Sequence, residues 1–402
     1  MPEARGGCVS AAEVVRVLRA RGLWIAVAES CTGGALASAL TDVEGASEVL
    51  AEARVVYSGA AKRALGLPPE RTEGEAVYSA ETAVALARAI VRIAPRADVG
   101  VGITGRLSFP DARGENGVWT AVRLGALDRA EYVEIDASVR DRPSAKRVVV
   151  ERALRTLGTM LCRLEGRRVW LTGSEAIAEE GARAVRAFGG VPVGSPLIRA
   201  VPRPDSLPEV SGFDRIVVTS PSAARIFSEG LARTGSEKAI GAMRFVSCGP
   251  GTSSALERAG ATNVEGPETG FGAAGLVEWA KGRARPGERW LRVRSDRAGT
   301  ALAEALRACG PEVEDRVLYD TVPTRPDDWP GFDDVLFASA SAVEAFFEGG
   351  GTTDGKRTVV IGRPTAEALR RWGVEPSAVA AEATAANAVA ALAESGGGRD
   401  AG

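Results

Sequence analysis

The sequence of 402 residues contains no histidine, and aromatic side chains make up only 5 % of it. Without histidine the chain cannot form a Ser-His-Asp or Cys-His catalytic arrangement, or a zinc or haem site that uses a histidine ligand. A general base in this protein must therefore be a lysine, a tyrosine, an aspartate or a glutamate.

Cysteine pairs, long apolar runs and excess charge are also missing. The five cysteines form no CxxC pair, so we expect neither structural disulfides nor a metal site. No run approaches the roughly 18 apolar residues of a membrane helix, and the first residues, MPEARGG, lack the apolar core of a signal peptide. A formal charge of −2 favours neither nucleic acid nor a membrane surface. We expect a cytoplasmic protein without cofactor, metal, nucleic acid or membrane partner.

Length and periodicity divide the chain. At roughly 100 to 200 residues per domain, the sequence predicts two or three globular units. Up to residue 164, helical periodicity alternates with β-branched runs. Helices are expected at 11–21, 79–94 and 142–163, and strands at 23–29, 54–58, 98–104 and 117–124. This alternation predicts an α/β domain over residues 1–164.

The remainder repeats itself with an offset of 121 residues. RRVWLTGSEAIAEEGARAVRAFGG from residue 167 matches ERWLRVRSDRAGTALAEALRACGP from residue 288, and PLIRAVP at 196–202 matches VLYDTVP at 317–323. Each copy holds three β-branched runs, each followed by a turn and a helix, which is typical of a doubly wound parallel sheet. Proline-rich segments at 202–214 and 323–334 predict crossings between two lobes, and SGGGRDAG at 395–402 predicts a disordered tail.

Six strand-to-helix turns of the repeat are expected at the carboxyl ends of parallel strands, where free N–H groups and helix dipoles favour oxyanions. They lie at residues 173–174, 220–222, 249–252, 294–295, 339–341 and 362–365. Arg294, Arg297 and Arg363 can pair a carboxylate there. Serine and threonine before a helix are also ordinary N-caps, so each turn alone has a purely structural interpretation. Together the turns favour a cleft for a ligand with many carboxylates, and no GxGxxG or GxxxxGK[ST] motif supports a nucleotide there.

Residues 167–394 resemble the uroporphyrinogen-III synthase family through the [TA]S-x-S-A turns, through GPGT and GRPT ahead of helices, and through YDTVP at 319–323. The resemblance implies two doubly wound parallel-sheet lobes joined by a two-stranded hinge, with lobe 1 at 167–203 plus 322–394 and lobe 2 at 204–321. The implied reaction cyclises hydroxymethylbilane, a linear tetrapyrrole with eight carboxylates. The last pyrrole ring is inverted and water is lost.

Several site residues follow from this resemblance. Tyr319 would assist departure of the hydroxyl group, although a tyrosine that only packs on the hinge would give the same pattern. The implied cleft residues are Thr252, Thr365, Ser220, Ser222, Ser339 and Ser341. Gly173 stands where relatives often place an arginine. Because pyrrole nitrogens can expel the hydroxyl, the enzyme mainly has to hold a ring-closing conformation, while a tyrosine supplies a proton.

The N-terminal domain carries a different turn, ESCTGG at 29–34, between a strand and a helix. Such a turn can hold a nucleophile with its oxyanion hole, or a phosphate. Lys62 follows in VVYSGAAK, and a desolvated lysine can serve as the base for a serine. The alternative is that Ser30 and Thr32 are helix caps and that Lys62 is solvated.

Residues 11–164 resemble the CinA C-terminal domain, the nicotinamide mononucleotide amidase family. The matching pieces are ESCTGG, LT at 40–41, GAS at 45–47, Tyr57 with Lys62, SAETA at 79–83 and ITG at 103–105. The resemblance implies an α/β amidase-like domain that self-associates and acts on nicotinamide mononucleotide. The implied site consists of the nucleophile Ser30, its base Lys62, the network partner Tyr57, and Thr32, Gly33, Thr104 and Gly105 around the ligand.

Two departures leave the activity of this domain open. RLSFP at 106–110 replaces the family's Ala-Gly-Pro-Gly run, and EAR at 52–54 replaces a Gly-Gly pair. The leading hypothesis is a uroporphyrinogen-III synthase fused to an amidase-like domain that is either active or degenerate. The alternatives are an active amidase fused to a module that binds a tetrapyrrole or another polyanion without chemistry, and a non-catalytic scaffold.

Overall fold

A computed structural model describes most of the chain. The described residues are 10–108, 116–173, 175–194, 196–204, 207, 209–324 and 329–396. The chain divides into unit 1 (Met1–Arg167, Arg183–Val191 and Ala393–Gly402) and unit 2 (Arg168–Ala182 and Pro192–Leu392). Ser174, Phe109, Pro110 and most of the tail expected to be disordered lie outside the described residues. Within the part that is described, no helix has both the length and the hydrophobicity to cross a membrane.

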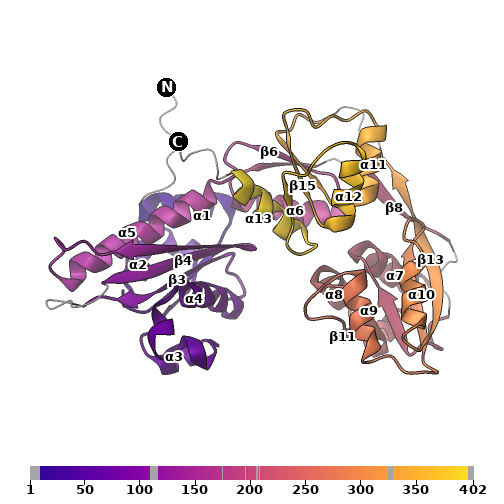
Figure 1. The fold of residues 1–402 in the computed structure, drawn as a ribbon, viewed down its shortest axis with the longest axis horizontal. Coiled ribbons are helices and arrows are strands. Elements are labelled where there is room, and N and C mark those ends of the chain that lie inside the picture. The colour runs from indigo at the N-terminus through magenta and orange to yellow at the C-terminus, as the bar shows by residue number, and fades with distance from the viewer. Residues whose placement is uncertain are drawn as a thin grey trace. The chain divides into compact units, whose positions relative to one another are not determined.

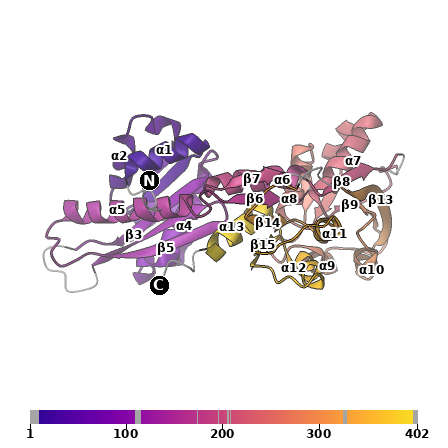
Figure 2. The ribbon, with the colours of Figure 1, turned by 90° about the horizontal axis from the view of Figure 1, so that it is seen from above.

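Unit 1 is built on a five-stranded sheet of order β2-β1-β3-β4-β5. β1 pairs in parallel with β2 and β3, and β4 and β5 continue the sheet antiparallel. Helices α1, α2 and α5 cover one face and α4 covers the other (Figures 1 and 2). The elements are α1 (Ala11–Arg21), β1 (Ile25–Glu29), α2 (Ala35–Thr41), η1 (Ala46–Glu48), β2 (Leu50–Val55), α3 (Gly59–Ala64), η2 (Pro69–Arg71), η3 (Glu75–Tyr78), α4 (Ala80–Ile93), β3 (Val99–Arg106), β4 (Gly117–Leu124), β5 (Leu127–Glu134) and α5 (Arg142–Leu161).

Local sequence signals explain most of these boundaries. Ser10 and Glu13 form a capping box at the start of α1, and Ser79 caps α4. The strand expected at 54–58 is displaced, because Ser58 accepts a hydrogen bond from the Ala61 N–H and caps α3, so the chain leaves β2 at Val55. Strand β5 was not expected.

Glycines bring α4 onto the central strand β3. A Cβ atom at Gly102 would lie 2.1 Å from the Ala83 carbonyl oxygen of α4, and one at Gly100 would lie 2.2 Å from that of Ala87. Glycine is therefore required at both of these positions of VGVGITG for α4 to pack closely on the sheet. This packing holds the carboxyl ends of β1 and β3 side by side.

Unit 2 contains two sheets with the same internal order, β11-β10-β9-β12-β13 and β16-β15-β14-β6-β7. The two sheets match strand by strand: β9 corresponds to β14, β10 to β15, β11 to β16, β12 to β6 and β13 to β7. The sequence repeat therefore folds into two equivalent sheets. Neighbours such as β9–β12 and β14–β6 are parallel. The prediction of two doubly wound parallel-sheet lobes is confirmed. We call the sheet β16-β15-β14-β6-β7 with its helices lobe 1. We call the sheet β11-β10-β9-β12-β13, to which β8 adds a sixth strand, with its helices lobe 2.

The elements after residue 167 follow in chain order. They are β6 (Arg168–Leu171), α6 (Glu175–Ala187), β7 (Val191–Gly194), β8 (Ile198–Pro202), β9 (Arg215–Val218), α7 (Pro221–Arg233), η4 (Glu237–Ala242), β10 (Arg244–Ser247), α8 (Pro250–Arg258), β11 (Asn263–Glu265), α9 (Ala273–Lys281), β12 (Arg289–Ser295), α10 (Ala301–Arg307), β13 (Glu312–Pro323), β14 (Asp334–Phe337), α11 (Ala340–Glu348), β15 (Arg357–Val360), α12 (Arg363–Arg371), β16 (Ala378–Val379) and α13 (Ala385–Ser395). The end of α6, the first residue of β7 and the end of α13 belong to unit 1, and the rest to unit 2.

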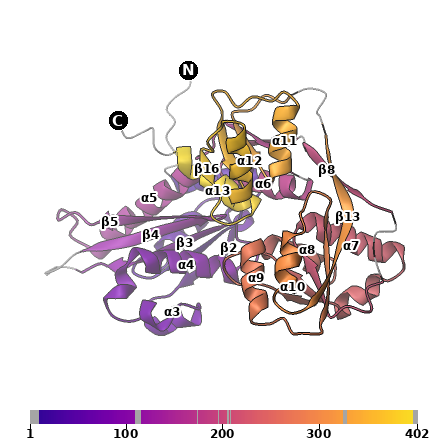
Figure 3. The same ribbon diagram turned by 45° about the vertical axis from the view of Figure 1, so that its right-hand side comes forward.

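The antiparallel pair β8–β13 forms the predicted two-stranded hinge (Figure 3). Its register runs from Tyr319 opposite Pro202 to Pro323 opposite Ile198. Strand β13 belongs to the sheet of lobe 2 and the next strand, β14, to that of lobe 1, so the chain changes lobes between these strands, as expected. The other crossing lies between β7 and β8 rather than at 202–214, because β8 already pairs with β13 at the edge of the lobe 2 sheet.

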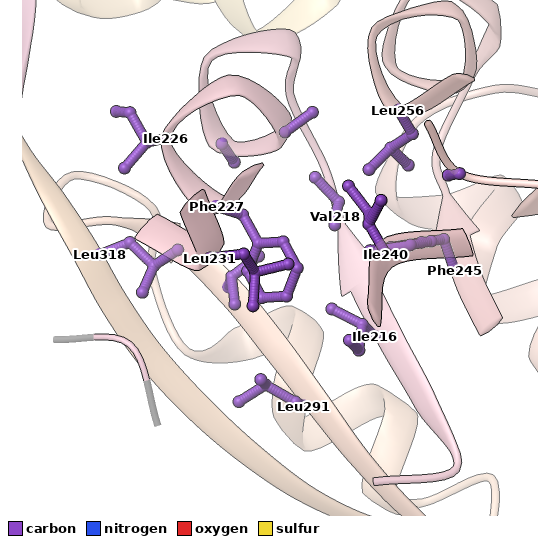
Figure 4. Close-up of a cluster of buried hydrophobic side chains, with 14 of the residues drawn as sticks. Ile216, Val218, Ile226, Phe227, Leu231, Ile240, Phe245, Leu256, Leu291 and Leu318 are labelled. Atoms are coloured by element: carbon purple, nitrogen blue, oxygen red, sulfur yellow. The ribbon is translucent and has the colours of Figure 1, made fainter. Parts of the chain in front are cut away.

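Each lobe has an apolar core between its sheet and its helices. In lobe 2, α7 buries Ile226, Phe227 and Leu231 at helical spacing, and these side chains gather against Ile216 and Leu291 of the strands (Figure 4). In lobe 1 the core is richer in aromatic rings, among them Trp170, Phe337 and Phe346. These cores fix the strand ends from which the site residues extend.

Candidate functional site

The first candidate site, in unit 1, centres on Ser30 and Lys62. The Lys62 side chain is 2 % exposed, and its Nζ donates hydrogen bonds to Ser30 Oγ at 3.1 Å and to the Val56 carbonyl at 2.9 Å. Burial lowers the pKa of Lys62 from 10.5. A buried amine that is more easily neutral can accept the proton of the hydroxyl it touches. The alternative that Lys62 is a solvated helix residue is therefore wrong.

The turn after β1 leaves the Ser30 hydroxyl available for chemistry. The Glu29 carboxylate, not Ser30 or Thr32, accepts hydrogen bonds from the Leu36 and Ala37 N–H groups at the start of α2. The alternative that Ser30 and Thr32 cap this helix is also wrong. Gly33 has φ 63° and Gly34 φ 95°, which make the tight turn. Thr32 Oγ1 is buried and forms no hydrogen bond with any described residue.

Cys31 does not compete with Ser30 as nucleophile. Its side chain is buried, and burial raises the pKa of the thiol to about 12. Because the thiolate is the reactive form, this thiol is unreactive at neutral pH. Of these two adjacent side chains, Ser30 is the one whose polar atom contacts the Lys62 amine.

A pocket of about 410 Å³ opens on this pair, within the usual range of small-molecule sites. Its lining residues are Ser30, Cys31, Tyr57, Gly59, Lys62, Thr72, Glu73, Gly74, Val77, Tyr78, Gly105, Arg106, Leu107, Ser108 and Arg142. Tyr57 and Gly105 are thus in the lining as expected, whereas Thr32, Gly33 and Thr104 are not. The Thr104 hydroxyl donates to the Val77 carbonyl and is buried.

The bulky residues after Gly105 line this pocket without closing it. Arg106 pairs with Glu75, and its guanidinium lies 4.4 Å from the centre of the Tyr78 ring. Leu107 is buried, and its carbonyl accepts a hydrogen bond from Arg142 at the start of α5. The charged side chains in the lining are thus basic at Lys62, Arg106 and Arg142 and acidic at Glu73, a balance that suits an anionic ligand. Sequence reasoning missed Arg142, which lies directly after the Asp141 N-cap.

The second candidate site, in unit 2, includes Tyr319 of β13. Its ring is 6 % exposed, and its hydroxyl lies 3.2 Å from Ser220 Oγ. Burial raises the pKa of Tyr319 above 10.0, although hydrogen bonds with Ser220 and Ser295 oppose the shift. Ser220 follows β9 and Ser295 ends β12, the neighbours at which the strand order reverses. Ligands of doubly wound sheets bind at that point. Because the pKa of Tyr319 is raised, its hydroxyl stays protonated at the place where a ligand is expected.

A cavity of about 990 Å³ lies in unit 2 next to this point. Its lining residues are Glu175, Ala178, Glu179, Ala182, Gly194, Pro196, Ile198, Arg199, Ala200, Pro221, Ser222, Arg225, Ser228, Ala255, Arg258, Ala259 and Thr324. They come from both lobes and from β8 of the hinge. Ser222 is thus in the lining, two residues after Ser220.

Three arginines that sequence reasoning missed line this cavity: Arg199, Arg225 and Arg258. Arg225 pairs with Glu229 at 2.7 Å. The guanidiniums of Arg199 and Arg258 form no ion pair or hydrogen bond with the residues that the structure describes. The only sequence signal was the position of Arg199 within the repeated segment PLIRAVP.

The other predicted residues of unit 2 lie outside this lining. Ser220 and Ser339 cap α7 and α11, and Ser341 lies in the first turn of α11. Thr252 and Thr365 are buried in the first turns of α8 and α12. Arg294 pairs with Asp315 at 2.7 Å, and Arg363 is exposed and pairs with Glu367. Among the described residues no group of Cys, Asp and Glu side chains is arranged to hold a metal ion.

Comparison with known families matches both halves of the chain. The model of uroporphyrinogen-III synthase HemD matches residues 179–390, more than half of the sequence, and that of the CinA C-terminal domain matches residues 9–161. The matched ranges follow one another without overlap, and together they cover most of the chain.

Individual relatives cover parts of the chain. A CinA-like protein of Geobacter sulfurreducens is 37 % identical over 118 residues, 29 % of this chain and 28 % of its own length. One of Myxococcus xanthus is 46 % identical over 96 residues, 24 % of this chain and 23 % of its own length. The chain thus spans about a quarter of the length of these curated relatives.

Solved structures resemble each half. Competence/damage inducible protein CihA of Agrobacterium tumefaciens is 28 % identical and covers 37 % of this chain and 90 % of its own, with a TM-score of 0.34. A mutant uroporphyrinogen III synthase of Thermus thermophilus is 21 % identical and covers 57 % of this chain and 98 % of its own, with a TM-score of 0.38. From the family match over more than half of its length, the chain belongs to the uroporphyrinogen-III synthase HemD family, and it carries a CinA C-terminal domain ahead of the two lobes.

Proposed function

We propose that the two lobes catalyse the uroporphyrinogen-III synthase reaction on hydroxymethylbilane. The observation that carries this proposal is the family match over residues 179–390. The buried Tyr319 hydroxyl beside Ser220 and the arginine-lined cavity support it. The reaction needs one proton donor and a surface that holds a polycarboxylate, and both features are compatible with a chain that has no histidine.

In the proposed mechanism, arginines and helix N-termini hold the substrate carboxylates so that the first and last pyrrole rings approach each other. The nitrogen lone pair of the ring that bears the hydroxymethyl group breaks its C–O bond. Tyr319 donates a proton, so the hydroxyl leaves as water. The α-carbon of the last ring that already carries the preceding methylene bridge attacks the freed methylene carbon. The old bond between that α-carbon and the preceding bridge then breaks, driven by the nitrogen lone pair of the neighbouring ring. The free α-carbon of the last ring closes on the released bridge carbon, which inverts the ring, and the proton that this α-carbon loses restores the tyrosine.

The test is the isomer formed from enzymatically generated hydroxymethylbilane. The full chain should give the type III product, whereas the reaction without enzyme gives the type I isomer. Formation of the type I isomer alone would refute the proposal. Tight tetrapyrrole binding without turnover would instead favour the alternative of a non-catalytic polyanion-binding module.

We propose a second activity for unit 1, the amide hydrolysis of nicotinamide mononucleotide, because Lys62 contacts Ser30 at the edge of a basic pocket. Ser30 Oγ attacks the amide carbon while Lys62 takes its proton and passes it to the nitrogen, which leaves as ammonia. Water then cleaves the acyl-serine, with Lys62 as the base. Ammonia release should occur with the full chain and should be lost in Ser30→Ala. No release from the unaltered chain would mean that this domain is degenerate.

Three further proposals concern the whole chain. Domain boundaries at 1–164, 167–203 plus 322–394, and 204–321 remain a proposal that limited proteolysis can test. Self-association through the N-terminal domain and a cytoplasmic location also remain proposals. Sedimentation of the purified chain in an analytical ultracentrifuge can test the first, and fractionation of cells can test the second.

A further inference from the structure

The cavity of unit 2 has charges of opposite sign on different elements. The residues that α6 contributes, Glu175, Ala178, Glu179 and Ala182, follow the spacing i, i+3, i+4, i+7 of one helix face, and both charged members are acidic. The elements β8, α7 and α8 contribute Arg199, Arg225 and Arg258. The cavity therefore has an acidic face on α6 and a basic face on the hinge and lobe 2.

Helix stability accounts for only part of the acidic face. Glu175 lies in the first turn of α6, where the helix dipole favours a carboxylate, whereas Glu179, one turn later, adds a like-charge repulsion at i, i+4. Glu175 and Glu179 have no ion pair with any described residue, and both are exposed to the cavity. Because both carboxylates line the cavity and pair with no side chain that the structure describes, their charge acts on any charged ligand that enters it.

The basic face holds two guanidiniums that are available to a ligand. Arg225 is already paired with Glu229, whereas Arg199 and Arg258 have no partner among the described residues. A guanidinium offers several N–H donors in a planar arrangement that matches a carboxylate. Arg199 lies on β8 and Arg258 at the end of α8, so the two charges come from different elements and can take two separate carboxylates.

We infer that Arg199 and Arg258 bind carboxylates of the substrate and that Glu175 and Glu179 repel them, so that the cavity sets the orientation of a polycarboxylate. This inference rests on the proposed function for the identity of the substrate and goes beyond it in naming the residues that select orientation. These are positioning residues, since none of them needs to touch the carbon that reacts. They act by fixing which side of the ligand lies against lobe 2.

Binding and catalysis give separate tests. The binding probes are uroporphyrin I, with eight carboxylates, and coproporphyrin I, with four, titrated by fluorescence into the full chain. Removal of an exposed guanidinium–carboxylate pair weakens binding by about fivefold, so Arg199→Ala with Arg258→Ala should weaken uroporphyrin binding by about 25-fold if the two sites are independent. The affinity for coproporphyrin should fall less. The matched control is Arg370→Ala, which removes an exposed arginine that pairs with Glu375 and does not line the cavity.

The acidic face is tested by Glu175→Gln with Glu179→Gln. This variant should bind uroporphyrin about threefold more tightly, because the repulsion of exposed like charges is lost. It should also form a smaller fraction of the type III isomer, because the substrate can then bind in more orientations. The matched control is Glu278→Gln, an exposed glutamate of α9 that pairs with Lys281.

The outcomes separate this inference from the proposed function. If the unaltered chain makes the type III isomer but the double arginine variant binds both porphyrins like the Arg370→Ala control, the inference is wrong and the proposed function stands. If the chain makes no type III isomer while the arginine variant loses uroporphyrin binding, the carboxylate sites stand and the proposed function fails. Unchanged affinity and isomer ratio in the glutamate variant would overturn the role of the acidic face.

Discussion

Substitution of Tyr319 by phenylalanine distinguishes a catalytic role of its hydroxyl from a packing role of its ring. The ring is almost fully buried and its hydroxyl contacts Ser220 at 3.2 Å and also Ser295, so phenylalanine fills the same volume and loses both hydrogen bonds. The free energy of unfolding should fall by only about 1 to 2 kcal/mol. Ser220 keeps its other hydrogen bond, from the Ala223 N–H at the start of α7.

The effect of the same substitution on turnover should be larger. A hydrogen bond to a group that gains charge contributes about 1.5 to 3 kcal/mol, and each 1.36 kcal/mol corresponds to a factor of about ten in rate. Tyr319→Phe should therefore lower kcat about 10-fold to 100-fold while KM changes little, because the hydroxyl acts on the leaving group and not on the carboxylates.

The assay measures the type III and type I isomers formed from enzymatically generated hydroxymethylbilane, with thermal unfolding recorded on the same samples. Tyr132→Phe is the matched control, since Tyr132 lies on β5 of unit 1 and the substitution leaves unit 2 unchanged. If Tyr319→Phe forms the type III isomer within twofold of the unaltered rate, the proton-donor role is refuted. Tyr319 would then be a packing residue of the hinge.

The other predictions concern buried groups. Burial lowers the pKa of Lys62 below 10.5, so the neutral fraction of its amine grows as the pH rises. Amide hydrolysis should therefore accelerate with pH, as measured by ammonia release across a pH series. Lys62→Met should abolish the hydrolysis at every pH. Gly105→Ala should lower the free energy of unfolding by about 1 to 3 kcal/mol in denaturant titrations, because its Cβ would lie 2.4 Å from the Val118 Cα; full stability would contradict the packing. Arg215→Ala should cost about 1.5 to 3 kcal/mol by the same measurement, because the half-buried carboxylate of Glu288, now 2.6 Å away, loses a charged hydrogen-bond donor and keeps only those from Trp290 and Arg285; a loss below 1 kcal/mol would show that the pair is solvated.

Much of the fold follows from local patterns. The helix expected at 11–21 and the strand expected at 117–124 have the observed bounds, because a capping box or a run of β-branched residues defines each of them. The prediction failed at 54–58, where the hydroxyl of Ser58 caps a helix in place of extending a strand. The repeat predicted two lobes because the same order of turns and helices recurs 121 residues later.

The candidate sites were less predictable than the fold. ESCTGG identified Ser30, and Lys62 followed from family resemblance, but only the structure shows that the amine is buried against the hydroxyl. Arg294 was expected to meet a ligand because it follows a strand, yet Asp315 on the neighbouring strand already pairs with it. A partner on another strand has no signature in the local sequence.

The sequence by itself determined the residue types available for catalysis, the duplication, and the turns that end parallel strands, because these depend on composition and on short-range periodicity. Tertiary structure alone decided which charges remain without partners. Arg199 and Arg258 reach one cavity from segments almost 60 residues apart, and α6 adds two glutamates to it from a third segment. Electrostatic energy depends on distance in space, and packing sets that distance independently of separation along the chain.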